Sequence, residues 1–526
     1  MQNASHLGTS LRSASPRNSV NALPPELLWR IFMINTERGD LDECHWFDEL
    51  WYVDNPDDRL DTARSCSQVC QSWRTLLLQF SSVWGRLLHI QSFEHVADEW
   101  REAVISRIGD APLWIIGTVS DSTRPFIFSI LQNKWQNVQN LLVWNKKLHD
   151  DKILPTWSFL KKEAPTLEVF KLWTNPFNHE SDPLRILTFY PLFNNHAPRL
   201  RIFSPRTFQL NLPTPWLSNL HHIRFSKEQS APLILSTLKF MPLLRHLVIS
   251  VISKNERGHI SQTEDGDLDK PHLPLLETLW IDTQETHWTN DPNHLELSLL
   301  LESITLPPAQ HTLRTLHIPD AGIATLNQDR VHRAITKWIH TYMASCPPRH
   351  LALCDSDHFL TLQDTWSVLE GMRVGLAFDS HFLSIKNIAD SPHFSAVEKF
   401  HIVLRDSTSW CPPLRPLYQA LRFINHLAAS GKGIGALFHD ILEFSLFPRL
   451  HTLEVFGADE HSINDDRSGE ESIIPKIIHF LEHRVSTAYP VSVLDLSDLN
   501  VAGVSDIHKG RLGEISGLSV KFPEDG

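Results

Sequence analysis

The chain has 526 residues, of which 42% are hydrophobic, and this is ample apolar material for a large core of its own. Its formal net charge of −13 argues against a general nucleic-acid-binding protein, which needs a basic face, and argues more weakly against binding to an anionic membrane. The 6 cysteines are scattered and include no Cys-x-x-Cys, so the sequence predicts neither a zinc ribbon nor a disulfide framework, and it indicates a reducing compartment.

Residues 1–20 are rich in Ser and Asn and contain no acidic residue, so we expect a disordered tail. Arg12 and Arg17 leave a mitochondrial presequence open as an alternative. No apolar run approaches the ~18 residues of a membrane span, and the N-terminus lacks a signal-peptide apolar region. We therefore expect a cytoplasmic or nuclear protein that does not bind membranes.

The first predicted element is a short helix that follows Leu23-Pro24-Pro25-Glu26. Proline suits the first helical turn, where its missing N–H costs nothing, and the Glu26 carboxylate suits the positive end of the helix dipole. The apolar face of this helix would hold Leu27, Leu28, Ile31 and Phe32.

A second, longer helix is predicted over residues 64–80, because its apolar residues recur at helical spacing on one side. These residues are Cys66, Val69, Cys70, Trp73, Leu76, Leu77 and Phe80. The Ser81-Ser82 pair would end this helix, and Val83-Trp84 would begin another short one.

The combination Leu-Pro-Pro-Glu-Leu-Leu-x-x-Ile-Phe, then Ser-x-Val-Cys-x-x-Trp-Arg, then a further Trp, closely resembles the F-box over roughly residues 21–92. In that family the module is a group of three helices that binds the Skp-type adaptor of cullin–RING (SCF) ubiquitin ligases. The resemblance implies adaptor contacts at or near Leu23, Pro24, Leu27, Ile31, Phe32, Val69 and Cys70. It places Trp73 and Trp84 in the small helical core. An ordinary pair of amphipathic helices is the alternative interpretation.

One departure from a compact F-box is an acidic insertion at 33–61, between the two pieces of the motif. It holds ten acidic residues against Arg38 and Arg59, and it carries Trp46, Phe47, Trp51 and Tyr52. We expect a solvated, family-specific loop, and a partner-binding loop or a short packed helix is the alternative.

From residue 93 to residue 526 a short apolar phrase recurs, of the form apolar-x-x-apolar-x-apolar. Alternating apolar residues predict a strand, and a phrase that returns every 20–50 residues is typical of a solenoid. The phrase begins at Val138, Leu167, Leu220, Leu244, Leu276, Leu313, Val397, Leu450, Val491 and Ile515. In the phrase Leu276–Ile281, Glu277 and Trp280 are predicted to be available on a concave surface of the stack.

Helices are predicted between some of these strands, over residues 330–343, 417–427 and 473–481. We therefore predict an α/β protein in which a small N-terminal three-helix F-box precedes an irregular leucine-rich-repeat-like solenoid of strand–helix repeats. The spacing is irregular and the usual Asn or Cys ladder position is mostly missing, so a non-repetitive α/β domain stays open.

No catalytic motif occurs: the chain lacks a phosphate-binding loop, a Gly-x-Ser-x-Gly elbow and a His-Glu-x-x-His helix. Gly431–Gly435 is glycine-rich but lacks phosphate-loop spacing, and neither Cys44-His45 nor His221-His222 is a ready chelate. We predict no cofactor and no metal.

The functional hypothesis is a non-catalytic substrate-recognition adaptor of an SCF-type ubiquitin ligase. Its partners would be the Skp-type adaptor, a cullin–RING ligase reached through that adaptor, and a protein substrate held by the repeats. The alternatives are a binding scaffold outside ubiquitin ligation and an enzyme whose site is formed by residues scattered over the repeats.

Overall fold

The computed structural model of the chain forms two compact units, Met1–Phe177 and Asn178–Gly526. It describes residues 23–36, 58–145, 157–174, 191–205, 214–226, 229–250, 270–282, 294–305, 315–318, 328–356, 359–363, 374–379, 389–403, 414–430, 434–456, 473–498 and 506–522. No helix among these residues is long and apolar enough to cross a membrane.

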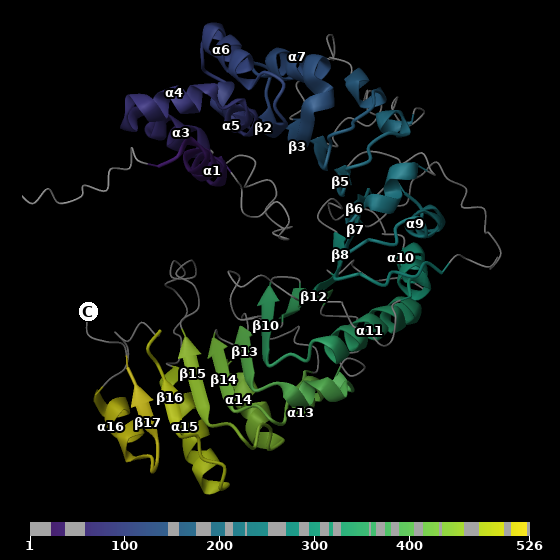
Figure 1. Cartoon of the computed structure of the whole chain (residues 1–526). Helices are drawn as coiled ribbons and strands as arrows, with labels where there is room; N and C mark the ends of the chain where they lie inside the picture. The colour runs from purple at the N-terminus through teal and green to yellow at the C-terminus, as the bar shows by residue number, and fades with distance from the viewer. Residues whose placement is uncertain are drawn as a thin grey trace, which may run out of the picture. The chain divides into compact units, whose positions relative to one another are not determined.

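The first unit begins with helices α1 (Pro25–Thr36), α3 (Asp58–Val69), α4 (Gln71–Gln79) and α5 (Ser81–Arg86), which Figure 1 shows grouped together. Helix α3 starts at Asp58, so the last part of the predicted insertion at 33–61 is helical, and α1 likewise runs on to Thr36. The Arg59 guanidinium of α3 donates to the Thr36 carbonyl at 3.0 Å. The two ends of the acidic stretch are therefore joined.

The single helix predicted over residues 64–80 is wrong, because Cys70 divides it into α3 and α4. The Cys70 backbone is extended (φ −160°, ψ 166°), and its sulfur accepts a hydrogen bond from the Trp73 amide at 3.5 Å. Cys70 is thus the N-cap of α4, a role that satisfies one of the unpaired amides of the first helical turn. Apolar spacing continues through this break, which explains why periodicity alone did not reveal it.

Four parallel strands complete the first unit: β1 (Leu88–His89), β2 (Leu113–Val119), β3 (Val138–Asn145) and β4 (Val169–Thr174). Helices α6 (Asp98–Ile108) and α7 (Arg124–Lys134) alternate with them. Strand β1 lies inside the range 21–92 that the sequence assigned to the F-box, yet it pairs with β2. The sheet therefore begins within the N-terminal module.

The second unit contains a run of five parallel strands, β5 (Ile202–Pro205), β6 (His222–Phe225), β7 (His246–Ser250), β8 (Thr278–Asp282) and β9 (Thr315–Ile318). A second parallel run consists of β10 (His350–Ser356), β13 (Lys399–Val403), β14 (His426–Ser430), β15 (Thr452–Phe456), β16 (Val493–Asp495) and β17 (Ser519–Lys521). Strands β11 (Phe359–Gln363) and β12 (Val374–Asp379) lie between the runs, with β11 antiparallel to both β10 and β12. The α/β class is confirmed. Neighbouring strands within both runs pair in parallel, and β11 departs from this pattern.

Each apolar phrase overlaps a strand, as predicted, and strand residues of the phrases pair in register between neighbouring repeats. Leu247 of β7 pairs with Leu279 of β8, and Leu453 of β15 pairs with Leu494 of β16. All four side chains are 0% exposed. A single strand cannot bury such a row alone, so each repeat depends on its neighbours for burial.

Helices follow many of the strands, and two of the three predicted helices are confirmed. They are α11 (Gln328–Ser345) and α15 (Ile473–Ser486), and Phe480 of α15 stacks on Phe438 of α14 (Ile434–Glu443) at 4.4 Å. The helix predicted over 417–427 is wrong in its second half, because α13 (Arg415–Ala420) ends and β14 begins at His426. Ile424, Leu427 and Ala429 form an apolar phrase of their own, whose last member is only an alanine.

Backbone hydrogen bonds link neighbouring repeats where the strands begin. The carbonyl of His221 accepts the amides of both Arg245 and His246, at 2.8 and 2.9 Å. In the same way, the carbonyl of Asn425 accepts the amides of His451 and Thr452, at 2.8 and 2.9 Å. Because peptide groups make these bonds, they require no particular side chain.

Candidate docking face on the N-terminal helices

Helix α1 has one face packed in the core of the N-terminal helices. Its first turn is closed by the Leu27 and Leu28 amides, which donate to the Pro24 carbonyl at 3.0 and 3.1 Å. The buried side chains of α1 are Leu28, Phe32, Met33 and Thr36. Their spacing marks one side of the helix as core.

The opposite side of α1 is also apolar, but it faces solvent. Leu27, Ile31 and Ile34 are 48%, 39% and 56% exposed, and their spacing of four and then three residues aligns them in one row. We call these three residues the outer row. Ile34 was missed from the sequence, although it continues the spacing of Leu27 and Ile31.

Exposed apolar side chains are concentrated on these helices. Among the described residues eleven large hydrophobic side chains are exposed, and six of them belong to α1, α3 and α4: Leu27, Trp29, Ile31, Ile34, Val69 and Leu78. Scattered single residues of this kind need no explanation, whereas a local concentration marks a protein interaction site.

The residues predicted to contact an adaptor fall into three environments: exposed, half-buried and buried. Pro24, Leu27, Ile31 and Val69 are exposed, with Val69 at 60%, and Leu23 is half-buried. Phe32 is 2% exposed, so in this structure it belongs to the core and not to the surface. Cys70 is half-buried and acts as the N-cap of α4.

The two tryptophans predicted in the module's core do make core contacts. The Trp73 ring meets Phe32 edge to face, with centroids 5.3 Å apart, although part of Trp73 remains accessible. Trp84 is 7% exposed, and its indole N–H donates to the Leu77 carbonyl at 2.8 Å. These contacts hold α1, α4 and α5 together beneath the outer row.

Two thiols, Cys66 and Cys70, belong to the described part of this module. Burial raises the pKa of the Cys66 thiol, against a smaller opposing effect of a backbone hydrogen bond, and therefore keeps it protonated. The Cys70 sulfur already accepts the Trp73 amide.

A second candidate surface lies on strands β13–β15, on the sheet face that carries the residues between the buried apolar positions. The Nε2 atom of His426 lies 2.8 Å from the Glu454 carboxylate, and the His401 ring meets Phe456 edge to face at 4.5 Å. Burial, and secondarily the nearby His426, lowers the pKa of His401 to about 3, so this imidazole is neutral at pH 7.

The same sheet face continues onto β16 and β17 with a charged pair. Lys521 donates to the Asp495 carboxylate at 3.0 Å, and Ser497 donates to it through both its backbone amide and its hydroxyl. Burial alone would raise the pKa of Asp495, but these hydrogen bonds and the Lys521 charge outweigh it, so the pKa is lowered. In this polar part of the face Asp495 is half-buried, whereas Ser497 and Lys521 are exposed.

The equivalent face of β8 differs from the prediction. Trp280 is 5% exposed and therefore not accessible to a partner, and the Glu277 carboxylate accepts a hydrogen bond from Arg245 at 3.0 Å. The residues Cys44, His45 and Trp46 lie outside the described part of the chain, as does most of Gly431–Gly435. Within the described ranges no group of three or more His, Cys, Asp or Glu side chains is arranged to hold a metal ion.

Comparison with known proteins adds no relative: the chain matches no model of a protein family, and no curated protein matches it.

Proposed function

We propose that this chain is the substrate-recognition adaptor of an SCF-type ubiquitin ligase, and that its outer row docks to the Skp-type subunit. The observation that carries the proposal is that α1 has a second apolar face, Leu27, Ile31 and Ile34, on the side away from its core. Burying a Leu or Ile side chain contributes about 1.5–3 kcal/mol, so an unoccupied row of this kind favours association. Val69, 60% exposed at the end of α3, adds apolar surface on the same module.

The repeats would hold the protein substrate, and the adaptor would link it to a cullin–RING ligase. No catalytic centre is needed for this role, because tethering raises the effective concentration of substrate lysines near the charged conjugating enzyme. The half-buried polar residues of β13–β17, among them His401, Glu454 and Asp495, are the part of the sheet face that we assign to substrate contact. Cytoplasm or nucleus, where such ligases act, is the proposed location.

A binding scaffold outside ubiquitin ligation is the second candidate, because the outer row would serve any apolar partner equally well. The two proposals differ in a single property, which is recognition of the Skp-type adaptor followed by ubiquitin transfer.

Reconstitution of the ligase separates them. The purified full chain is combined with a Skp-type adaptor, a cullin–RING subunit and ubiquitin-charged conjugating enzyme, and ubiquitin transfer onto the chain or onto captured proteins is measured. We expect transfer with the native chain and none with the double variant Leu27→Asp/Ile31→Asp. Ile507→Asp is the matched control, since Ile507 is also apolar and is 76% exposed, on α16 (Asp506–Glu514). Failure of the native chain to support transfer would reject the ligase role.

A further inference from the structure

Helix α5 belongs both to the N-terminal helices and to the repeats of the first unit. Toward the N-terminal helices, the Trp84 indole N–H donates to the Leu77 carbonyl of α4 at 2.8 Å. The Trp29 indole of α1 donates to the Ser82 hydroxyl of α5 at 3.1 Å. The helix that carries the outer row is therefore bonded directly to α5.

Toward the repeats, the same helix is held by arginine–aromatic contacts. The Arg107 guanidinium of α6 lies 4.7 Å from the Trp84 ring centre and 5.2 Å from that of Trp100. Arg86, at the end of α5, lies 4.4 Å from the Trp114 ring of β2. Such contacts are worth roughly 0.5–1 kcal/mol at exposed sites and more when they are desolvated.

The closest approach in this joint is at Gly85. A Cβ atom added there would overlap the Pro112 carbonyl oxygen, a backbone atom at the entrance to β2. The Gly85 backbone does not require a left-handed conformation, so the glycine serves close approach and not backbone freedom. One residue after α5 the chain enters β1, where Leu88 pairs with Ile115.

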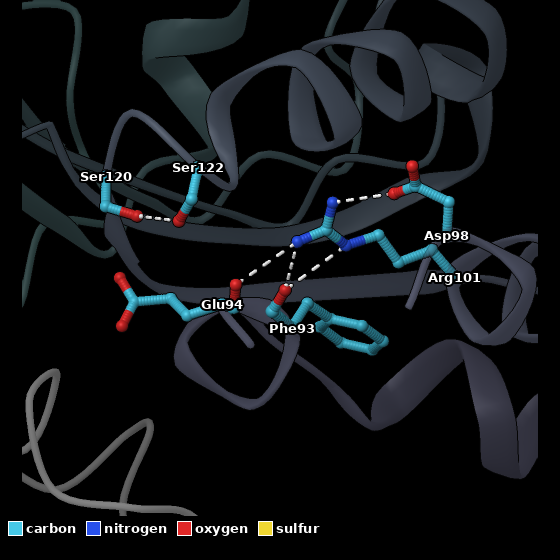
Figure 2. A network of polar contacts seen from close by, with 6 residues as sticks. All are labelled: Phe93, Glu94, Asp98, Arg101, Ser120 and Ser122. Atoms are coloured by element: carbon cyan, nitrogen blue, oxygen red, sulfur yellow. Dashed lines mark hydrogen bonds and ion pairs between the residues drawn. The ribbon is translucent and has the colours of Figure 1, made fainter. Parts of the chain in front are cut away.

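Helix α6, which supplies Arg107, is itself anchored. Figure 2 shows the Arg101 guanidinium donating to the carbonyl oxygens of Phe93 and Glu94 and to the Asp98 carboxylate. These carbonyls end the 3-10 turn Ile90–Phe93, and the turn directly follows β1. Helix α6, which contacts α5, is thus bonded to the turn that follows β1.

We infer that α5 fixes the direction of the docking face relative to strands β1–β4, with Gly85 and Arg107 as the positioning residues. The use of such a joint in a ligase rests on the proposed function, but the joint itself does not. The module is therefore not an independently oriented domain: its direction is set by how closely Gly85 approaches Pro112.

A distance measurement tests this inference. Spin labels carried on bioorthogonal amino acids are placed at Asn35 of α1 and Asn133 of α7, both exposed, and the distance distribution is recorded in the full chain. We expect one narrow peak for the native chain. Gly85→Ala should shift or broaden the peak, because a backbone atom must move to admit the methyl group. Gly510→Ala is the matched control and should leave the peak unchanged, since an added Cβ at Gly510 meets nothing within 4 Å.

Arg107→Ala keeps the inference testable if Gly85→Ala does not fold, and it too should broaden the peak. Arg449→Ala, which removes an arginine–aromatic contact with Phe423 elsewhere in the repeats, should not. A broad distribution in the native chain, or native-like peaks in both joint variants, would overturn the inference.

Capture of the Skp-type adaptor by Gly85→Ala should match that by the native chain, because the outer row is untouched. If the native chain captures no adaptor, the proposed function fails while the distance result still decides the joint.

Discussion

At the scale of single residues, the neighbours Ile31 and Phe32 lie in opposite environments. Phe32 is 2% exposed and packs on Trp73, whereas Ile31 is 39% exposed in the outer row. We expect Phe32→Ala to lower the free energy of unfolding by about 3–5 kcal/mol, as for other buried aromatic side chains. Ile31→Ala should change it by no more than about 0.5 kcal/mol. Urea denaturation of both variants checks this, and equal losses would show that the two faces of α1 are wrongly assigned.

Also at the scale of single residues, His401 makes the stability of the folded chain depend on pH. Its pKa of about 3 in the folded chain lies below the ordinary histidine value, so between these two pH values the unfolded chain binds a proton that the folded chain does not. Stability from this residue is therefore present near pH 7 and is lost as the pH falls toward 3. His401→Phe, which can still pack on Phe456, should unfold with a weaker dependence on pH between 7 and 4. Parallel unfolding curves for the two proteins would contradict the assignment.

Sequence reasoning grouped the buried Phe32 with Leu27, Ile31 and Val69, which are exposed. The reason is physical: α1 is apolar on two sides, and the spacing of apolar residues cannot tell which side the rest of the chain covers. The burial of Phe32 and its contacts with Trp73 and Phe80 show that it belongs to the core.

At the scale of elements, the break between α3 and α4 depends on the Cys70 side chain as an N-cap. Serine caps helices well, and replacing a capping residue by alanine typically costs about 0.5–2 kcal/mol. We expect Cys70→Ser to be at least as stable as the native chain and Cys70→Ala to be less stable by an amount in this range. Thermal unfolding of the pair measures the difference. A Cys70→Ala variant as stable as Cys70→Ser would show that the cap contributes nothing.

The strands were predicted from sequence far better than the helix boundaries. Phrases such as Leu450-x-x-Leu453-x-Val455 place three aliphatic residues in the stacked core. Because burial requires apolar residues at these fixed positions, the strands can be recognised in the sequence. Strand β14 was missed because Ala429, opposite Ile402 and Val455, is small, which leaves a weaker pattern. The hairpin of β11 and β12 was missed because it extends the sheet without following the repeat.

At the scale of the whole molecule, the α/β class with stacked strand–helix repeats could be predicted, whereas the joint between module and repeats could not. The sequence suggested a boundary near residue 92, yet β1 pairs with β2 and α5 packs against β2 through Gly85 and Pro112. Such long-range contacts leave no periodic pattern. The packing role of a single glycine or of a pair of tryptophans can be recognised only when the residues that contact them are known.

The central claim is that the outer row binds a Skp-type adaptor, and calorimetric titration of the purified adaptor into the full chain tests it most directly. We predict binding by the native chain and by Ile507→Asp. Ile31→Asp should weaken binding by at least about tenfold, the equivalent of 1.4 kcal/mol, because a carboxylate would be buried in an apolar contact. No binding by the native chain, or equal binding by Ile31→Asp, would contradict the claim.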